Sequence, residues 1–156
     1  MVIRIKLAQK DDLDEITVLW YELATMHEKI MEGYDLSENA RDEWKELMEK
    51  SLKRKDMITL IAWERGKILG FASVMLRNRA PFFKQKDMGV IMDVFVKKER
   101  RGEGIGGKLV KRAESWIKNK GIDLAIITVA PENQGAVEFW GEQGYSTYLL
   151  RQRKEL

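Results

Sequence analysis

A glycine-rich segment constrains the fold of this chain more than any other feature of its sequence. The segment Arg101–Gly107 follows an apolar run over residues 90–96 and precedes apolar residues at helical spacing over 105–117. Glycines between a strand and a helix let the backbone approach a ligand closely, and the first turn of a helix presents unpaired N–H groups to an anion. We therefore predict a strand–turn–helix unit that holds a phosphate group.

Positive charge is concentrated on the same segment. Residues 97–112 carry seven Lys or Arg and two Glu, a net charge of +5, although the whole chain of 156 residues has a net charge of only +3. The small overall excess predicts no nucleic-acid partner. Its concentration beside the glycines favours a phosphorylated ligand.

The residue types that are missing exclude several kinds of site. The chain has no cysteine and a single histidine, His27. This excludes disulfides, thiol nucleophiles, cysteine-based zinc sites and any site with two imidazoles, so we expect no metal. The N-terminus lacks the apolar core of a secretory signal, and no apolar run approaches the ~18 residues of a membrane span. We therefore expect a cytoplasmic protein with no membrane partner.

Hydrophobic periodicity predicts a single domain over residues 1–156 with the element order β-α-α-β-β-β-α-β-α-β. Strands are expected at 2–7, 57–64, 68–76, 90–96, 122–129 and 145–150, and helices at 13–23, 40–52, 105–120 and 133–140. Hairpins join the strands of the first half, and helical crossovers join those of the second. The fold class is therefore α/β with a mixed (α+β) sheet that includes a parallel β–α–β unit. The nearly continuous apolar run 122–129 predicts a strand buried on both faces.

Three interpretations of the glycine turn compete. It could be a tight turn under a solvated basic surface, with no ligand. It could belong to a dinucleotide-binding fold, because Gly102, Gly104 and Gly107 fit G-x-G-x-x-G. That fingerprint normally opens its fold, with an acid at the end of the second strand, whereas Asp123 begins a strand here. The third interpretation takes the turn together with its neighbours.

Two sequence motifs occur in the second half of the chain, one at the glycine turn and one that begins with the last predicted helix. Residues 101–106 (RGEGIG) fit R/Q-x-x-G-x-G/A, and residues 133–145 fit N-x-x-A-x-x-F-Y-x-x-x-G-F with Trp140 for the Tyr and Tyr145 for the last Phe. With the element order, these motifs make essentially the whole chain resemble the GNAT superfamily of acetyl-CoA-dependent N-acetyltransferases. The resemblance implies the GNAT-like acyl-CoA N-acyltransferase fold, in which the two central parallel strands splay apart.

The resemblance also implies where acetyl-CoA would bind. Main-chain groups of Val94 and Val96 would pair with the pantetheine arm in the splay, the N–H groups of 101–107 would hold the pyrophosphate, and Asn133 would contact the cofactor arm. The implied cofactor-binding residues are Val94, Phe95, Val96, Arg101, Gly102, Glu103, Gly104, Ile105, Gly106, Gly107 and Asn133.

The implied chemistry is direct attack of an amine on the thioester, which needs a base for the amine and an acid for the departing thiolate. Many relatives carry a Tyr acid where this chain has Trp140, and some carry a Glu base where it has Met92. Tyr145 and Tyr148 could substitute as the acid, or water could protonate the thiolate. Both tyrosines could equally pack on the last strand. Asp93 is either the base or a structural carboxylate.

The acceptor amine, of a small molecule or a protein, would bind beside the first helices and the later strands. This points to the segment 27–36, where His27 is the side chain that titrates near neutral pH, and to residues 79–86. Trp140 and Met92 also suggest an alternative function, a domain that binds acyl-CoA without catalysis. The family includes homodimers, and the sequence leaves the oligomeric state open.

Overall fold

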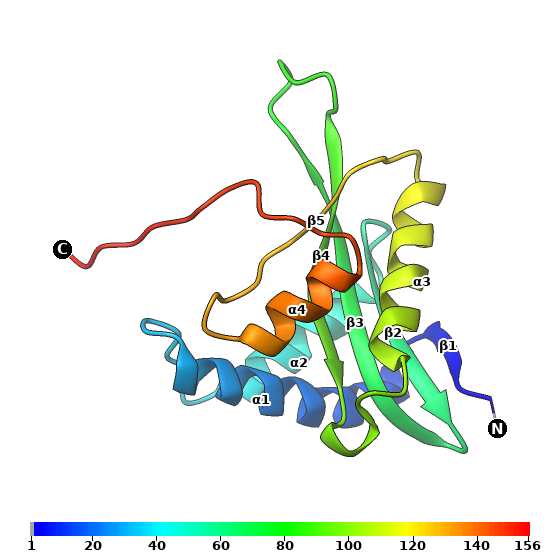
Figure 1. Ribbon diagram of the computed structural model, residues 1–156. Helices are drawn as coiled ribbons and strands as arrows, with labels where there is room; N and C mark the ends of the chain where they lie inside the picture. Colours follow the sequence, from blue (N-terminus) through cyan, green and yellow to red (C-terminus); the bar gives the residue numbers. More distant parts are fainter. Residues whose placement is uncertain (1) are drawn as a thin grey trace.

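The protein consists of a five-stranded sheet with helices packed on both faces (Figure 1). The computed structural model describes residues 2–156. The strands are β1 (Arg4–Leu7), β2 (Met57–Glu64), β3 (Lys67–Asn78), β4 (Asp87–Val96) and β5 (Ala125–Ile127). The helices are α1 (Leu13–Ile30), α2 (Ala40–Ser51), α3 (Ile105–Asn119) and α4 (Gln134–Glu142), with 3-10 turns at Lys10–Asp12 and Lys98–Arg100.

The strands lie in the order β1-β2-β3-β4-β5. The first four pair in antiparallel fashion, and β4 pairs with β5 in parallel after the crossover through α3. A tight turn joins β2 to β3, with Arg65 and Gly66 both at positive φ, as a two-residue hairpin requires. The predicted mixed sheet is therefore confirmed.

Each face of the sheet buries its own apolar cluster. One cluster packs Phe71 and Phe95 of the sheet against Leu13 and Ile16 of α1, and α2 joins it through Met48. The second cluster packs the opposite face against α3 and α4; its helical members are Ile105, Leu109, Val110, Ala113, Ile117 and Trp140. The sheet thus lies between the α1–α2 layer and the α3–α4 layer (Figure 1).

Phe71 is the largest of the fully buried side chains, and its ring contacts Trp44 edge-on at 6.0 Å between centroids. Replacing it with Ala removes the ring and leaves a cavity that the rigid sheet cannot close. We expect Phe71→Ala to lower the free energy of unfolding by about 3–5 kcal/mol. Urea denaturation measures this loss, and the exposed Phe82 serves as a control whose replacement by Ala changes stability by less than about 1 kcal/mol.

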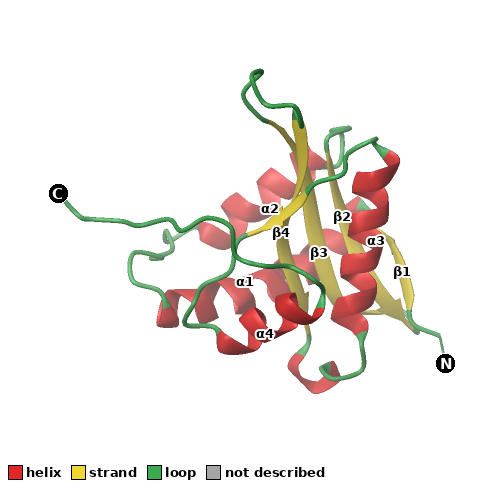
Figure 2. Cartoon of the chain, turned by 45° about the horizontal axis from the view of Figure 1, so that its top comes forward, coloured by secondary structure: helices red, strands yellow, loops and turns green. Residues whose placement is uncertain are grey.

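The last predicted strand, 145–150, is wrong. After α4 the chain continues without helix or strand, and the segment from Ser146 onward is exposed and runs away from the sheet (Figure 2). Residues 145–150 include Tyr and Thr, which favour strands, but a strand forms only where a neighbouring strand completes its hydrogen bonds.

Two other boundaries differ from the predicted ones. The strand expected at 122–129 shrinks to β5, whose three residues are partly rather than fully buried. Helix α1 continues to Ile30, seven residues beyond the predicted end, and so carries His27 in its last turn. Within residues 2–156, no helix combines the length and the apolar character that crossing a membrane would need.

Candidate active site

A β-bulge in β4 determines which way Asp93 faces. Ser73 of β3 is opposite Asp93 and Val74 is opposite Ile91, so Met92 is an extra residue on β4. Side chains alternate along a strand, and one extra residue reverses the faces beyond it. Ile91 therefore packs with the α3 cluster, whereas Phe95 packs with the α1 cluster. Asp93, two residues before Phe95, is turned toward α1.

The Asp93 carboxylate is held by a neighbour on β3. The Ser73 hydroxyl, which is fully buried, donates a hydrogen bond to Asp93 Oδ2 at 2.8 Å. Burial raises the pKa of Asp93. The Ser73 hydrogen bond and the charge of His27 act in the opposite direction but do not cancel this increase. Asp93 is thus a partly buried, oriented acid rather than a solvated surface charge.

His27 and Tyr34 complete a cluster around this acid. Their rings meet edge-on with centroids 5.4 Å apart. Burial lowers the pKa of His27 below its usual value near 6.5, opposed by the charge of Asp93. Burial also raises the pKa of Tyr34, and the charge of Asp93 raises it further. Ser73, Asp93, His27 and Tyr34 together are called the acid–base cluster below.

The sequence predicts two members of the acid–base cluster, His27 and Asp93, as candidate proton-transfer residues, but it gives no reason to place them together. Tyr34 lies in the segment 27–36, which the sequence predicts to bind the acceptor amine. Its phenol is the signal that could have marked it as a candidate site residue. Ser73 is an ordinary serine in a strand, and the sequence carries no signal for it. The bulge that aligns Ser73 with Asp93 depends on sheet register.

The edge of β4 that follows the bulge is open on the β5 side. Pairing with β5 covers only Gly89–Ile91, yet β4 continues to Val96. On the other side the Lys97 N–H donates to the Leu69 carbonyl at 2.8 Å. Because hydrogen-bonded pairs alternate in an antiparallel ladder, the main-chain groups of Val94 and Val96 point toward the open edge. The splay expected between the central parallel strands is therefore present.

Glycines shape the turn after β4. Gly102 and Gly104 have φ values of 85° and 80°, which other residues rarely adopt, and a Cβ atom at either would meet nothing within 4 Å. Gly104 is the N-cap of the 15-residue helix α3, whose first N–H groups lack helical partners. The turn thus leaves open space in front of a helix N-terminus, which fits a pyrophosphate group.

Of the remaining glycines of the turn, Gly106 is required by packing and Gly107 is not. A Cβ atom on Gly106 would lie 2.9 Å from the Phe139 ring, so this glycine lets α3 approach α4. A Cβ atom on Gly107 would meet Gln143 at an ordinary 3.5 Å. Ile105 is buried in the α3 cluster.

The charged residues of the turn are partly engaged with one another. Arg100 donates to Glu64 at 2.8 Å and to Glu103 at 2.7 Å, which raises the pKa of Arg100 and lowers that of Glu103. The Arg101 guanidinium lies over the Phe95 ring and donates from Nε to the Val96 carbonyl at 2.9 Å. These contacts brace the turn, and the basic side chains outside them remain for phosphate.

The second motif supplies helix α4 with a cap and a core residue. Asn133 Oδ1 accepts a hydrogen bond from the Ala136 N–H at 3.2 Å, which caps α4, and its Nδ2 lies 4.0 Å from the sulfur of Met26 on α1. Trp140, at the position of the usual family acid, is buried against Phe139. A buried indole cannot take the place of that acid.

The two tyrosines proposed as substitute acids lie apart from the acid–base cluster. The Tyr145 hydroxyl donates to Glu114 of α3 at 2.8 Å, and its ring packs edge-on against Trp140. Burial and the Glu114 contact both raise the pKa of Tyr145. Tyr148 is 64% exposed in the segment after α4.

We expect Tyr145→Phe to lower the stability of the fold and to leave the rate of acetyl transfer nearly unchanged. The change removes one hydrogen bond to Glu114, so the free energy of unfolding falls by about 1.5–3 kcal/mol and acetyl transfer at saturating substrate stays within about twofold. Tyr148→Phe should change neither quantity. Urea denaturation and a thiol-release assay of both variants measure the two effects, and a loss of turnover in either variant would contradict this assignment.

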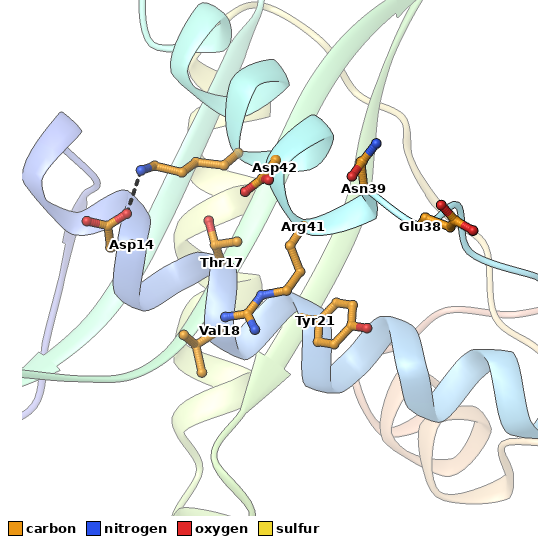
Figure 3. A pocket seen from close by; sticks show the side chains of 9 residues that line it. Asp14, Thr17, Val18, Tyr21, Glu38, Asn39, Arg41 and Asp42 are labelled. Atoms are coloured by element: carbon orange, nitrogen blue, oxygen red, sulfur yellow. Dashed lines mark ion pairs between the residues drawn. The ribbon is translucent and has the colours of Figure 1, made fainter.

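A groove on the described surface lies elsewhere. It has a volume of about 470 Å³ and runs between the outer faces of α1 and α2 (Figure 3). An ion pair between Lys45 and Asp14 crosses it at 2.5 Å, and the Arg41 guanidinium stacks on Tyr21. No residue of the acid–base cluster or of the glycine turn lines it.

Comparisons with known proteins agree with this geometry. A family model described as the acetyltransferase (GNAT) family matches residues 20–145. An uncharacterised N-acetyltransferase of Archaeoglobus fulgidus is 30% identical over 139 residues, 89% of this chain and 90% of that protein. One of Methanocaldococcus jannaschii is 28% identical over 142 residues, 90% of this chain, and the match spans only 59% of that longer protein.

A solved structure shows the same fold. An aminoglycoside acetyltransferase from an uncultured soil metagenomic sample superposes with a TM-score of 0.73 over 99% of this chain and 96% of that one, at 17% identity. Identity at this level bears on the fold alone. The family match over residues 20–145 establishes more: the chain belongs to the acetyltransferase (GNAT) family.

Proposed function

We propose that this protein transfers the acetyl group of acetyl-CoA to a primary amine, within a complex that holds both substrates. The observation that carries the proposal is the open edge of β4, which runs from the acid–base cluster at Asp93 to the glycine turn at Gly104. This edge would join a pyrophosphate site to a proton-transfer site in one continuous path.

Residues along this path would hold acetyl-CoA, which supplies the acetyl thioester. The N–H groups at Gly102 and Gly104, with the N-terminus of α3, would bind the pyrophosphate. The main-chain groups of Val94 and Val96 would pair with the pantetheine amides as a further strand would. The Val96 carbonyl already accepts from Arg101, so the Val94 groups and the Val96 N–H carry most of this pairing.

The acid–base cluster would prepare the amine for attack. An alkyl ammonium must lose a proton first, and a neutral imidazole can take it. The lowered pKa of His27 keeps it neutral at pH 7, and the charge of Asp93 stabilises the imidazolium that results. The raised pKa of Tyr34 keeps its phenol protonated, so it could give that proton to the departing thiolate, and the phenolate would take up the second proton that the attacking nitrogen loses.

Thiol release measured over a panel of amines tests the proposal. We expect acetyl-CoA to raise the melting temperature and at least one amine to accelerate release of free CoA. Tight binding of acetyl-CoA without release for any amine would instead support a domain that binds acyl-CoA without catalysis. Stabilisation by NAD(H) and not by CoA would support the dinucleotide-binding alternative.

A further inference from the structure

The hairpin between β3 and β4 projects beyond the body of the protein (Figure 1). Phe82 at its tip is 82% exposed, and Phe83 beside it is 41% exposed. Residues 77–86 also carry four basic side chains and no acidic one; these are Arg77, Arg79, Lys84 and Lys86. We call residues 77–86 the basic arm.

The basic arm is ordered by its own contacts. The Arg79 N–H donates to the Lys86 carbonyl at 2.5 Å, and the Phe83 N–H closes a turn on Ala80 at 3.1 Å. The Arg79 guanidinium covers the Phe83 ring at 4.1 Å, while Phe82 contacts Phe83 at 4.9 Å between centroids. These contacts hold the loop that carries the exposed Phe82 ring.

Within residues 2–156 the basic side chains of the arm have no acidic partner, and the Phe82 ring stays largely exposed beside Phe83. Exposed aromatic rings combined with unpaired Arg and Lys are typical of surfaces that bind an anionic partner with apolar groups. Charge complementarity thus requires a partner that is negative and partly apolar.

We propose that the basic arm docks an acidic polypeptide that carries the acceptor amine. This inference rests on the proposed function, because acetyl transfer needs a primary alkyl amine. Lysine side chains and N-termini of polypeptides supply such amines, whereas nucleic acids and phosphate groups do not. An acidic, partly apolar stretch of the same polypeptide would contact Phe82 and the four basic side chains.

The geometry of β4 sets the size of this acceptor. Asp93 lies six residues along the strand from Asp87 at the base of the arm. At about 3.3 Å per residue this is a separation of roughly 20 Å. A small amine cannot contact both places, but an extended peptide spans the interval with about six to eight residues. The arm therefore favours long acceptors over short ones.

Three synthetic probes test the proposal. The first is a blocked peptide with one lysine, an eight-residue spacer and the segment Glu-Leu-Glu-Leu-Glu; the second replaces each Glu by Gln; the third is a blocked lysine amide. We expect kcat/KM for the acidic peptide to exceed that for the neutral peptide at least tenfold. The double variant Phe82→Ser/Lys84→Glu should abolish this difference through KM, with the rate on the lysine amide unchanged.

The matched control is Arg4→Glu, which reverses one exposed charge beside Trp63, at the opposite end of the sheet from the arm, and should leave all three rates unchanged. Melting temperatures verify that the variants are folded. Equal rates on the acidic and neutral peptides, or an arm variant that keeps the preference, would overturn the proposal.

A binding measurement separates this proposal from the proposed function. Fluorescence anisotropy of the labelled acidic peptide, without acetyl-CoA, should give a Kd at least tenfold weaker for the arm variant than for the unmodified protein. Absence of binding overturns the arm proposal even if the lysine amide is acetylated. Arm-dependent binding without acetylation of any amine overturns the proposed function alone. Tighter arm-dependent binding of a 16-nucleotide oligothymidine than of the peptide would assign the arm to nucleic acid and overturn the proposal.

Discussion

Gly104→Val should weaken acetyl-CoA binding by about a hundredfold. The valine side chain would occupy the open space in front of the α3 N-terminus, and its strain at φ 80° would turn the first N–H groups away. Each charge-assisted hydrogen bond contributes about 1.5–3 kcal/mol, so losing one or two accounts for the effect. Isothermal titration calorimetry with acetyl-CoA measures the change.

Gly121→Val is the matched control for this experiment. Gly121 follows the other end of α3 with a φ of 78°, and a Cβ atom there would also meet nothing within 4 Å. Both substitutions therefore strain the backbone equally, but only Gly104 faces the proposed pyrophosphate site. An equal loss of affinity in both variants, or unchanged affinity in Gly104→Val, would contradict the placement of the cofactor.

Removing the imidazole should have the largest effect on turnover. We expect His27→Ala to lower kcat by about 10²–10⁴-fold, the usual contribution of a positioned base, and to leave the Kd of acetyl-CoA unchanged. Lys29→Ala, an exposed neighbour in the same helical turn, is the control. A His27→Ala enzyme with a kcat within twofold of the unmodified enzyme would eliminate His27 as the base.

The pH dependence of kcat tests the same assignment through Asp93. Turnover requires neutral His27, so kcat should rise with pH through a midpoint below 6.5, because burial lowers the pKa of His27 from that value. The charge of Asp93 opposes that shift; Asp93→Asn removes the charge, so the acidic limb should move to still lower pH while the plateau falls. A limb that stays in place in Asp93→Asn would show that the two residues are not coupled.

Local sequence chemistry predicted the elements that depend on near neighbours. The hairpin at Gly66 and the glycine turn after β4 were predictable because backbone conformation at these positions requires glycine. The helix after the turn was predictable because apolar residues such as Leu109 and Ala113 repeat at helical spacing. In the candidate site, the features that such local chemistry predicted were the glycine turn proposed to bind the cofactor and the positive charge around it.

Features that depend on distant contacts were not predictable from one sequence. The residue types of Tyr145–Leu150 favour a strand, but no strand forms where no neighbour completes its hydrogen bonds. Asp93 faces His27 only because Met92 is an extra residue in the register of β4 with β3. Tyr145 binds Glu114 instead of joining that cluster, a contact between elements far apart in the chain.

Backbone amide shifts during titration with acetyl-CoA test the central claim most directly, because they locate the ligand without any assumption about the acceptor. We predict that the ¹⁵N–¹H resonances of Val94, Val96, Gly102 and Gly104 move together and saturate at one site, while those of Thr17 and Arg41 in the α1–α2 groove remain in place. Shifts confined to the α1–α2 groove, with Val94 and Gly104 unmoved, would contradict the account.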